Sequence, residues 1–540
     1  MIRQASLALV VASTVAQAAA QLPPFPVPPG NPITEQKRIL GKLLFFEEQL
    51  SSDDTISCAT CHLPASGGVD PRLGVDPGDL PFPGDDTLGS PGVVSANSSN
   101  LFAPHSVFGL DEQVTARAAP TTIGAAYAQE LFWDGRASSA FVDPETGLIS
   151  LPFAASLESQ AVEPILSDVE MAHAGRTWDQ VRAKLEQIRP LALATEIPPD
   201  MASALAQDPT YPDLFEAAFG SALIDADRIG RALATYQRTL IPDQTPFDAF
   251  QAGTPGALTP PQVAGLNAFN ATTCNNCHSG PLFSDQSFRN VGLRPWQEDG
   301  GRFDVTGNFA DRGRFKVPTL RNVGLKPRMM HNGRLSDLGD VLDFYIGSPQ
   351  FPQFDDNKDP LINQINVPPP ARQQIIDFLT NGLTDPRVRD ELFPFDRPVL
   401  ASERMQDELV QLGPGHAGTA NVTPRWIRVA PAAAGSPDFK LGLREALPGT
   451  AAVLTISTGA APIGTTVLDA PVYVDPGSLI VSSGAMTVAG LDGFGHATVP
   501  LPVPDVTALV GLGLTSQWFV FDAGASAGLA ATSGLGFQIH

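Results

Sequence analysis

The pattern of hydrophobic positions divides the chain into a long helical part and a shorter β part. Thr34 is a favourable N-cap, and residues 37–46 place their apolar side chains on one face of a helix. The same periodicity predicts further helices at 178–188, 229–240, 260–269, 335–345 and 371–379. Stretches rich in glycine, proline and polar residues predict long loop regions at 63–105 and 279–330.

Beyond about residue 425 the pattern is typical of β-structure. Runs rich in valine, threonine and glycine, bounded by turn residues, predict strands at 452–457, 472–474, 478–482 and 517–521. Short strands at regular spacing favour a β-sandwich-like domain. We therefore predict a mainly α fold with two helical domains followed by a β-sandwich-like domain, at 31–245, 246–400 and 425–540.

Composition and charge narrow the location and the partners. The net charge of −23 disfavours binding to nucleic acid, and it either steers a basic partner protein or simply keeps a secreted protein in solution. Residues 1–20 are typical of a signal peptide, because Arg3 precedes a short apolar run and alanine-rich cleavage sites. The rest of the sequence contains no apolar stretch of spanning length, so we expect a periplasmic or secreted protein without a membrane span.

All four cysteines of the chain belong to two Cys-x-x-Cys-His motifs, the attachment signature of haem c. Two thiols reach the vinyl groups on one edge of the porphyrin, and the following histidine lies under the iron. A zinc site, a pair of disulfides or a redox dithiol needs no histidine directly after each cysteine pair. The motifs predict two covalently bound haem c groups, attached through Cys58, Cys61, Cys274 and Cys277, with His62 and His278 as proximal iron ligands.

Several separate stretches resemble bacterial dihaem cytochrome c peroxidases and their relative MauG, which oxidises a protein substrate. The resemblance covers residues 31–400 and includes both cysteine motifs; the β-rich part has no counterpart. The other matching stretches are 131–137, 156–171, 315–323 and His331-Asn-Gly333. The resemblance implies an oxidoreductase that reduces hydrogen peroxide to water with electrons from a small cytochrome or cupredoxin.

The resemblance also implies different tasks for the two haems. The first, bound by His62, is the peroxidatic haem, and Glu170 and Gln160 match the family's distal carboxylate and neighbouring amide. A carboxylate in a mostly apolar pocket has a raised pKa, so it can take a proton from one peroxide oxygen and return it to the other. Trp133 matches the aromatic residue that lies between the haems.

The sixth ligand of the second haem separates two branches of this family. The peroxidases use a methionine, whereas this chain has Tyr345 at the matching position, as in MauG-like members. A phenolate stabilises ferric iron and lowers the reduction potential, so Tyr345 favours the MauG-like branch. Met329 and Met330 are competing ligands.

The sequence departs from the family at several positions. Residues 141–155 resemble an insertion, and His105 is out of register with the histidine that closes the first haem in some members. Ala118 replaces the asparagine that binds calcium between the haems, and the charges of Lys326 and Arg328 lie near the remaining calcium ligands. These changes argue against bound calcium.

Three functions remain open at this point. The first is a dihaem peroxidase, the second a MauG-like oxidase that modifies a protein side chain, and the third a non-catalytic dihaem electron carrier. The carrier would leave Glu170 and Gln160 without a task. The sequence does not give the oligomeric state, and we also consider a homodimer.

Overall fold

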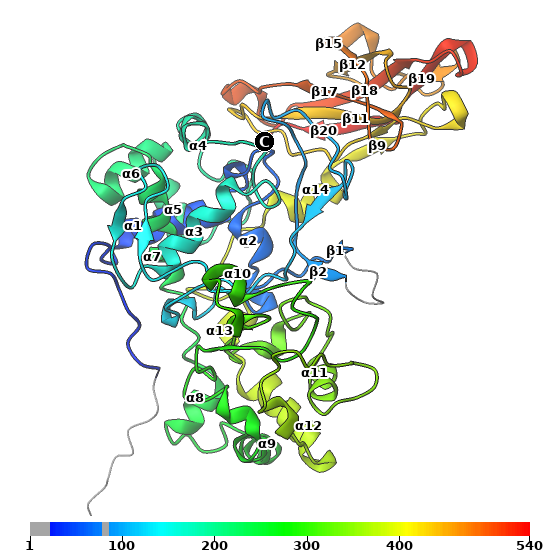
Figure 1. Cartoon of the computed structure of the whole chain (residues 1–540). Coiled ribbons are helices and arrows are strands. Elements are labelled where there is room, and N and C mark those ends of the chain that lie inside the picture. The colour runs from blue at the N-terminus through cyan, green and yellow to red at the C-terminus, as the bar shows by residue number, and fades with distance from the viewer. Residues whose placement is uncertain (1–21, 78–85) are drawn as a thin grey trace, which may run out of the picture.

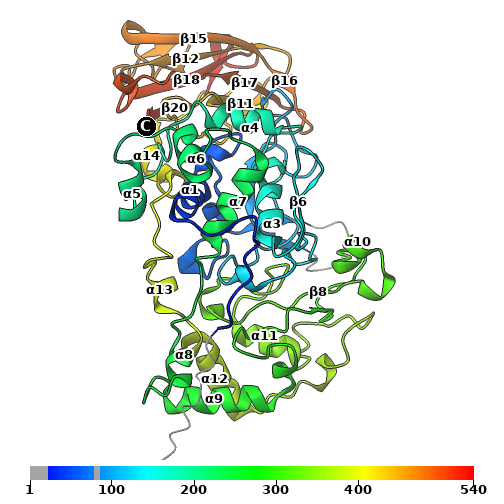
Figure 2. The same ribbon diagram turned by 90° about the vertical axis from the view of Figure 1, so that its left-hand side faces the viewer.

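The computed structural model describes residues 22–77 and 86–540, which form three regions along the long axis of the molecule (Figure 1). Each region has its own large hydrophobic cluster. The first helical unit lies in the middle, with the second helical unit at one end and a β module at the other (Figures 1 and 2). The predicted signal peptide and its boundary lie outside the described residues. None of the helices in the described residues is long and apolar enough to cross a bilayer.

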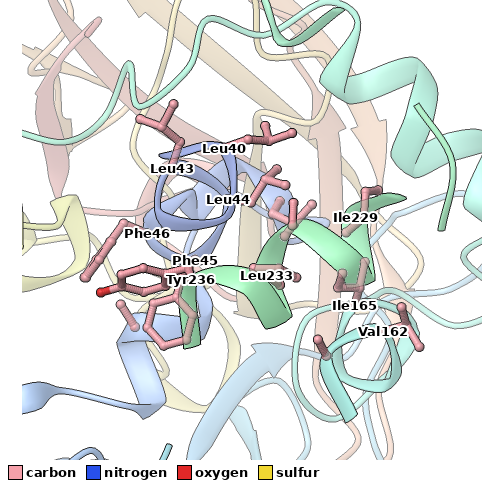
Figure 3. Packing of buried hydrophobic residues seen from close by; sticks show 14 of the residues in the cluster. Leu40, Leu43, Leu44, Phe45, Phe46, Val162, Ile165, Ile229, Leu233 and Tyr236 are labelled. Carbon is pink, nitrogen blue, oxygen red and sulfur yellow. The ribbon is translucent and has the colours of Figure 1, made fainter. Parts of the chain in front are cut away.

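The first helical unit is built around α1, which begins where the sequence predicts. Thr34 caps this helix by accepting a hydrogen bond from the Lys37 backbone N–H at 3.3 Å. Figure 3 shows Leu40 and Leu44 of α1 packed beside Leu233 of α7. The helices of the unit are α1 (Glu35–Phe46), α2 (Cys58–Cys61), α3 (Ser156–Leu166), α4 (Trp178–Leu185), α5 (Pro199–Leu205), α6 (Tyr211–Phe219) and α7 (Ala226–Gln237).

Short strands interrupt the long connections of this unit. The predicted loop region at 63–105 contains three of them, and the predicted insertion at 141–155 forms a hairpin. Ser150 in this hairpin accepts a hydrogen bond from Arg231 of α7 at 2.7 Å, which fixes the hairpin to the helical core. The strands are β1 (Gly74–Asp76), β2 (Thr87–Gly89), β3 (Pro91–Val94), β4 (Glu112–Val114), β5 (Phe141–Val142) and β6 (Ile149–Leu151).

The second helical unit is smaller and centres on α9, whose N-cap Thr259 and Gln262 form a capping box. Its elements are α8 (Pro246–Gln251), α9 (Pro260–Ala271), β7 (Phe288–Arg289), α10 (Arg302–Thr306), β8 (Phe315–Lys316), α11 (Leu338–Tyr345) and α12 (Pro369–Asp377). After α12 the chain returns to the first unit through α13 (Pro386–Arg389) and α14 (Ala401–Glu408). Val388, Phe395 and Leu400 belong to the first hydrophobic cluster. The domain boundaries stay a prediction.

The two helical units share one packing device. Each cysteine motif follows a helix that contains a glycine against the backbone of a later helix. A Cβ on Gly41 of α1 would lie 1.9 Å from the Ala232 carbonyl oxygen of α7, and a Cβ on Gly265 of α9 would lie 2.0 Å from the Gln374 carbonyl oxygen of α12. Only glycine permits such close helix contacts, so both cysteine motifs start from the same construction.

The β module is built on two antiparallel sheets whose inner faces share one hydrophobic cluster, and β13 and β14 pair separately as a two-stranded sheet. One sheet has the order β10-β11-β17-β16 and the other β15-β12-β18-β20-β9, with β19 beside β18. Leu441 and Val499 of the first sheet and Leu454 and Trp518 of the second belong to this cluster. The strands are β9 (Val410–Leu412), β10 (Arg425–Trp426), β11 (Lys440–Ala446), β12 (Ala451–Ser457), β13 (Thr466–Val467), β14 (Ala470–Pro471), β15 (Leu479–Met486), β16 (Val488–Ala489), β17 (Gly495–Pro500), β18 (Gly513–Phe521), β19 (Leu529–Ala531) and β20 (Gly534–Gln538).

One predicted strand of the β module is wrong. Residues 472–474 form no strand, and Val474 makes only an isolated bridge with Ala460. The Tyr473 N–H donates to the side-chain oxygen of Gln517 at 2.9 Å, so a side chain takes the place of a neighbouring strand. The alternation of valine and tyrosine reflects packing here rather than a β-ladder.

The β module packs against the first helical unit (Figure 2). Ile427 joins Val94, Phe102 and Leu110 of the β3–β4 loop region in a small buried cluster. The Lys440 ammonium lies 4.7 Å from the centre of the Phe102 ring. The β module thus covers the β3–β4 loop region, which follows the first cysteine motif in the chain after β1 and β2.

Candidate haem sites

The first cysteine motif forms α2, which Ser57 and Thr60 close with a capping box. Its histidine, His62, directly follows the helix, and the His62 Nδ1 lies 3.1 Å from the Gly68 carbonyl oxygen. A carbonyl only accepts, so Nδ1 carries the proton and Nε2 keeps a free lone pair. Burial lowers the pKa of His62, which also favours the neutral ring that an iron ligand requires.

The second motif repeats this arrangement with different secondary structure. Cys274 lies in a 3₁₀ turn (Thr273–Asn276), and the His278 N–H donates to the Cys274 carbonyl oxygen at 2.9 Å. The His278 Nδ1 lies 3.0 Å from the Phe283 carbonyl oxygen, and burial lowers the pKa of this histidine too. Both histidines therefore fit the role of a haem ligand. All four cysteines are free thiols, as attachment of haem requires.

A cavity lies beside each of these two histidines. The His62 cavity is also lined by Gln160 of α3 and by Trp133. Glu170 is not among its lining residues, and it lies in the turn that follows α3. The Glu170 carboxylate is near the first cysteine motif. Burial raises the pKa of Cys58 to about 12, and the negative charge of Glu170 contributes to this rise. Burial also raises the pKa of Glu170 itself.

The His278 cavity is larger and mostly apolar. Cys274, Cys277 and His278 line it together with all three candidates for the sixth ligand, Tyr345, Met329 and Met330. Tyr345 is the last residue of α11, and burial followed by the charges of both cysteines raises its pKa. The structure therefore brings all three candidate ligands to the same cavity.

The two cavities share a wall. Six residues line both of them, and this set is called the shared wall: Trp133, Lys316, Val317, Pro318, Thr319 and Lys326. The Trp133 Nε1–H donates to the Ala118 carbonyl oxygen at 2.8 Å, and the Trp133 carbonyl accepts from the Lys316 N–H at 2.8 Å. These bonds hold the indole between the cavities, where the resemblance implies it.

Sequence reasoning assigned no role to His331, although it named the motif that contains it. Its ring stacks on Phe315 at 3.6 Å and meets Trp133 edge-on at 6.3 Å. Burial lowers the pKa of His331 to about 3, and none of the described residues forms a hydrogen bond with its buried Nε2. No sequence pattern shows that these three rings meet, because they come from three separate segments.

The remaining candidates from the sequence are His105 and the positions that correspond to the family's calcium site. The His105 Nδ1 accepts from the backbone N–H of Val107 at 3.2 Å, and its ring stacks on Phe108. His105 is not among the residues that line the His62 cavity. Ala118 lines the His278 cavity together with Arg328, and Lys326 lies in the shared wall. The described residues contain no group of three or more histidine, cysteine or acidic side chains that could hold a metal ion.

Two helical units, each with a cysteine motif, an oriented histidine and an adjoining cavity, define the class of dihaem redox proteins. Residues 35–255 match the family model of the di-haem cytochrome c peroxidases, and the chain belongs to this family. The family and the enzyme class predicted from the sequence, a peroxidase-type oxidoreductase, are thus confirmed.

Individual relatives cover both branches of this family. The chain is 29% identical over 306 residues to the cytochrome c551 peroxidase of Nitrosomonas europaea, which covers 56% of this chain and 70% of that protein. It is 30% identical over 325 residues to the methylamine utilization protein MauG of Methylorubrum extorquens, covering 59% and 71%. The crystal structure of a MauG-like protein associated with microbial copper homeostasis has a similar fold, with a TM-score of 0.50 and 24% identity over 70% of this chain and 97% of that one.

Proposed function

We propose that this protein is a dihaem c-type peroxidase that reduces hydrogen peroxide to two water molecules, using two electrons and two protons. The observation that carries the proposal is the shared wall, because Trp133 lines the cavities of both oriented histidines. The two cavities also differ, because Gln160 lines only the His62 cavity and Tyr345 lines only the His278 cavity. A protein that only carries electrons through two equivalent haems would not need this difference.

The residues have separate tasks in this proposal. When bound, a haem supplies an iron that coordinates peroxide and exchanges electrons with it. His62 would hold this iron through Nε2, while its Nδ1 bond to Gly68 keeps the ring in place. Glu170 would take the proton from one peroxide oxygen and deliver it to the leaving oxygen, and its raised pKa suits both steps. Gln160 would orient the peroxide.

Trp133 would carry electrons between the two sites, because it lies in the wall that separates them. His278 and Tyr345 would hold the second iron. An anionic phenolate favours the oxidised metal, so this site would store an oxidising equivalent rather than accept electrons readily. Tyr345 thus supports a second candidate function, MauG-like oxidation of a protein side chain at the surface.

The proposal includes covalent haem and a place outside the cytoplasm. The four free thiols are the attachment points in this reading, and haem c is attached in the oxidising compartment to which the predicted signal peptide leads. The electron donor would be a small periplasmic cytochrome or cupredoxin. Its binding would depend on charge, since the protein carries a net charge of −23.

Replacement of Glu170 by glutamine tests the catalytic assignment. We expect Glu170→Gln to lower peroxide turnover about 10²- to 10⁴-fold, the usual contribution of a general acid–base residue, with both haems retained. Burial raises the pKa of Glu170, so the parent should lose activity on acidification already above the ordinary carboxyl range, and the variant should lack this limb. Glu163→Gln is the matched control, because Glu163 is a neighbouring glutamate, 40% exposed and paired with Arg136. Full turnover by Glu170→Gln would remove Glu170 from the mechanism.

A further inference from the structure

The shared wall contains two lysines, and they differ in their surroundings. The Lys316 ammonium donates a hydrogen bond to the Glu130 carbonyl oxygen at 2.8 Å. None of the described residues forms a hydrogen bond or an ion pair with the Lys326 ammonium. Both lysines line the His62 cavity and the His278 cavity. Lys326 therefore brings an unmatched positive charge to the place where the two sites meet.

The backbone fixes this position of Lys326. The Lys326 N–H donates to the Val323 carbonyl at 3.2 Å, at the end of a 3₁₀ turn (Val323–Leu325). Its Cγ would lie 3.2 Å from a Cβ built on Gly67, so the lysine stem runs along the turn whose next residue, Gly68, orients His62. The charge of Lys326 also acts on His278, whose pKa it lowers in addition to burial. The ammonium thus acts on His278, while the lysine stem passes beside the turn that orients His62.

Such a charge is unfavourable in the protein alone. Burial lowers the pKa of Lys326 to about 8, because an ammonium that leaves water without meeting a counter-charge loses its hydration. Each haem, however, carries two propionate carboxylates, so the groups expected in the two cavities are anionic. The unmatched lysine is therefore complementary to the prosthetic groups rather than to any side chain of the described chain.

We propose that Lys326 is a built-in cation between the two haems, which pairs with haem carboxylate and raises the reduction potentials of both irons. The inference rests on the proposed dihaem function. Reduction adds an electron to each haem, and a nearby positive charge stabilises the reduced form more than the oxidised form. The ammonium would then supply between the haems the positive charge that a bound metal ion would otherwise supply, which also accounts for the change to Ala118.

Redox titration of the holoprotein, followed by absorbance, tests this role. We expect Lys326→Met to shift both haem midpoint potentials downward, whereas Lys326→Arg keeps the charge and leaves both close to the parent. Arg328→Met is the comparison variant, because Arg328 lines only the His278 cavity, and it should shift one potential only. A calcium chelator should leave the parent unchanged.

Several results would overturn the proposal. Lys326→Met with unchanged potentials, or with a shift of one haem alone, would show that the lysine does not serve both sites. A chelator-induced shift in the parent would show that a metal ion is the cation. If Lys326→Met binds less than two haems, Lys326→Gln replaces it under the same criteria. The titration needs two bound haems but no peroxide turnover, so failure of the peroxidase proposal would not be mistaken for failure of this one.

Discussion

Lys184 of α4 is the most heavily buried ion-pair partner between the first helical unit and the β module. Its ammonium lies 2.6 Å from an Asp54 carboxylate oxygen and 2.8 Å from one of Asp438, and its side chain is 3% exposed. It also donates to the Ser51 carbonyl oxygen at 2.7 Å. Asp54 belongs to the helical unit and Asp438 to the segment just before β11. Replacing Lys184 by methionine therefore removes the charge that links the two regions.

The magnitude follows from the two carboxylates that remain. Asp438 is 27% exposed and can turn to water, whereas Asp54 is fully buried and cannot. Loss of one partner of a buried pair costs about 3–5 kcal/mol. Asp54 can avoid a larger cost by taking up a proton, which at pH 7 costs an ordinary aspartate of pKa about 3.9 roughly 4 kcal/mol. We therefore expect Lys184→Met to destabilise the junction by about 3–4 kcal/mol at pH 7.

Protonation of Asp54 determines how the stability of the variant depends on pH. Burial already raises the pKa of Asp54 in the parent, and removal of Lys184 raises it further. The folded variant then binds more protons than the unfolded chain, so its stability falls as pH rises from about 4 to 7. The penalty should shrink by about 1.4 kcal/mol for each pH unit on acidification.

Hydrogen exchange of the amides at the junction measures this effect directly. At pH 7 the expected penalty corresponds to roughly 10²- to 10³-fold faster opening, and at pH 5 the remaining difference from the parent should be less than about tenfold. Arg189→Met is the matched control, because Arg189 and Asp505 form a 2.9 Å pair across the same junction with side chains 36% and 48% exposed. An exposed pair contributes about 0–1 kcal/mol. Equal effects of the two substitutions, or a penalty independent of pH, would refute the reasoning.

Two further substitutions test the path between the sites. Tyr345→Met should raise the reduction potential of the haem bound by His278 and change its absorption spectrum, because methionine stabilises ferrous iron. An unaltered second haem would instead point to Met329 or Met330 as the ligand. Trp133→Phe keeps an aromatic ring but loses the bond to the Ala118 carbonyl, at a cost of about 1 kcal/mol in unfolding free energy. It should slow electron transfer between the haems, measured by stopped-flow absorbance, while the first haem still reacts with peroxide; equal transfer rates would exclude Trp133 from the path.

The local signals in the sequence predicted much of the helical part. Caps such as Thr34 and Thr259 define helix starts through bonds within one turn, so they can be read without knowledge of the fold. The strand predicted at 472–474 was wrong because its outcome depends on Gln517, which is distant in sequence. The contact between His331, Phe315 and Trp133 has the same origin. Tertiary contacts of this kind leave no periodicity in the sequence.

In the candidate sites, too, local sequence motifs predict some features and tertiary contacts determine the others. The cysteine motifs predict the attachment points and the histidines, because five consecutive residues contain them. The Nδ1 bonds to Gly68 and Phe283 come from loops, and the surroundings of Lys326 depend on segments from both helical units. A family resemblance assigns roles to the residues that match a family motif, but it assigns none to a residue that differs from the motif. From the sequence, the charge of Lys326 only argues against bound calcium; its position in the shared wall comes from the structure.

The two candidate sites agree around their histidines and differ in the rest of their cavity linings. On the histidine side, both units use a glycine-packed helix, a cysteine pair and a histidine whose Nδ1 meets a backbone carbonyl. Elsewhere in the linings, the first cavity has the Gln160 amide and the second has the Tyr345 phenol. Attachment of haem needs the same geometry at both sites, which accounts for the shared features. In the proposed function, the differing linings assign peroxide to one iron and charge storage to the other, and the shared wall with Trp133 and Lys326 would couple the two sites.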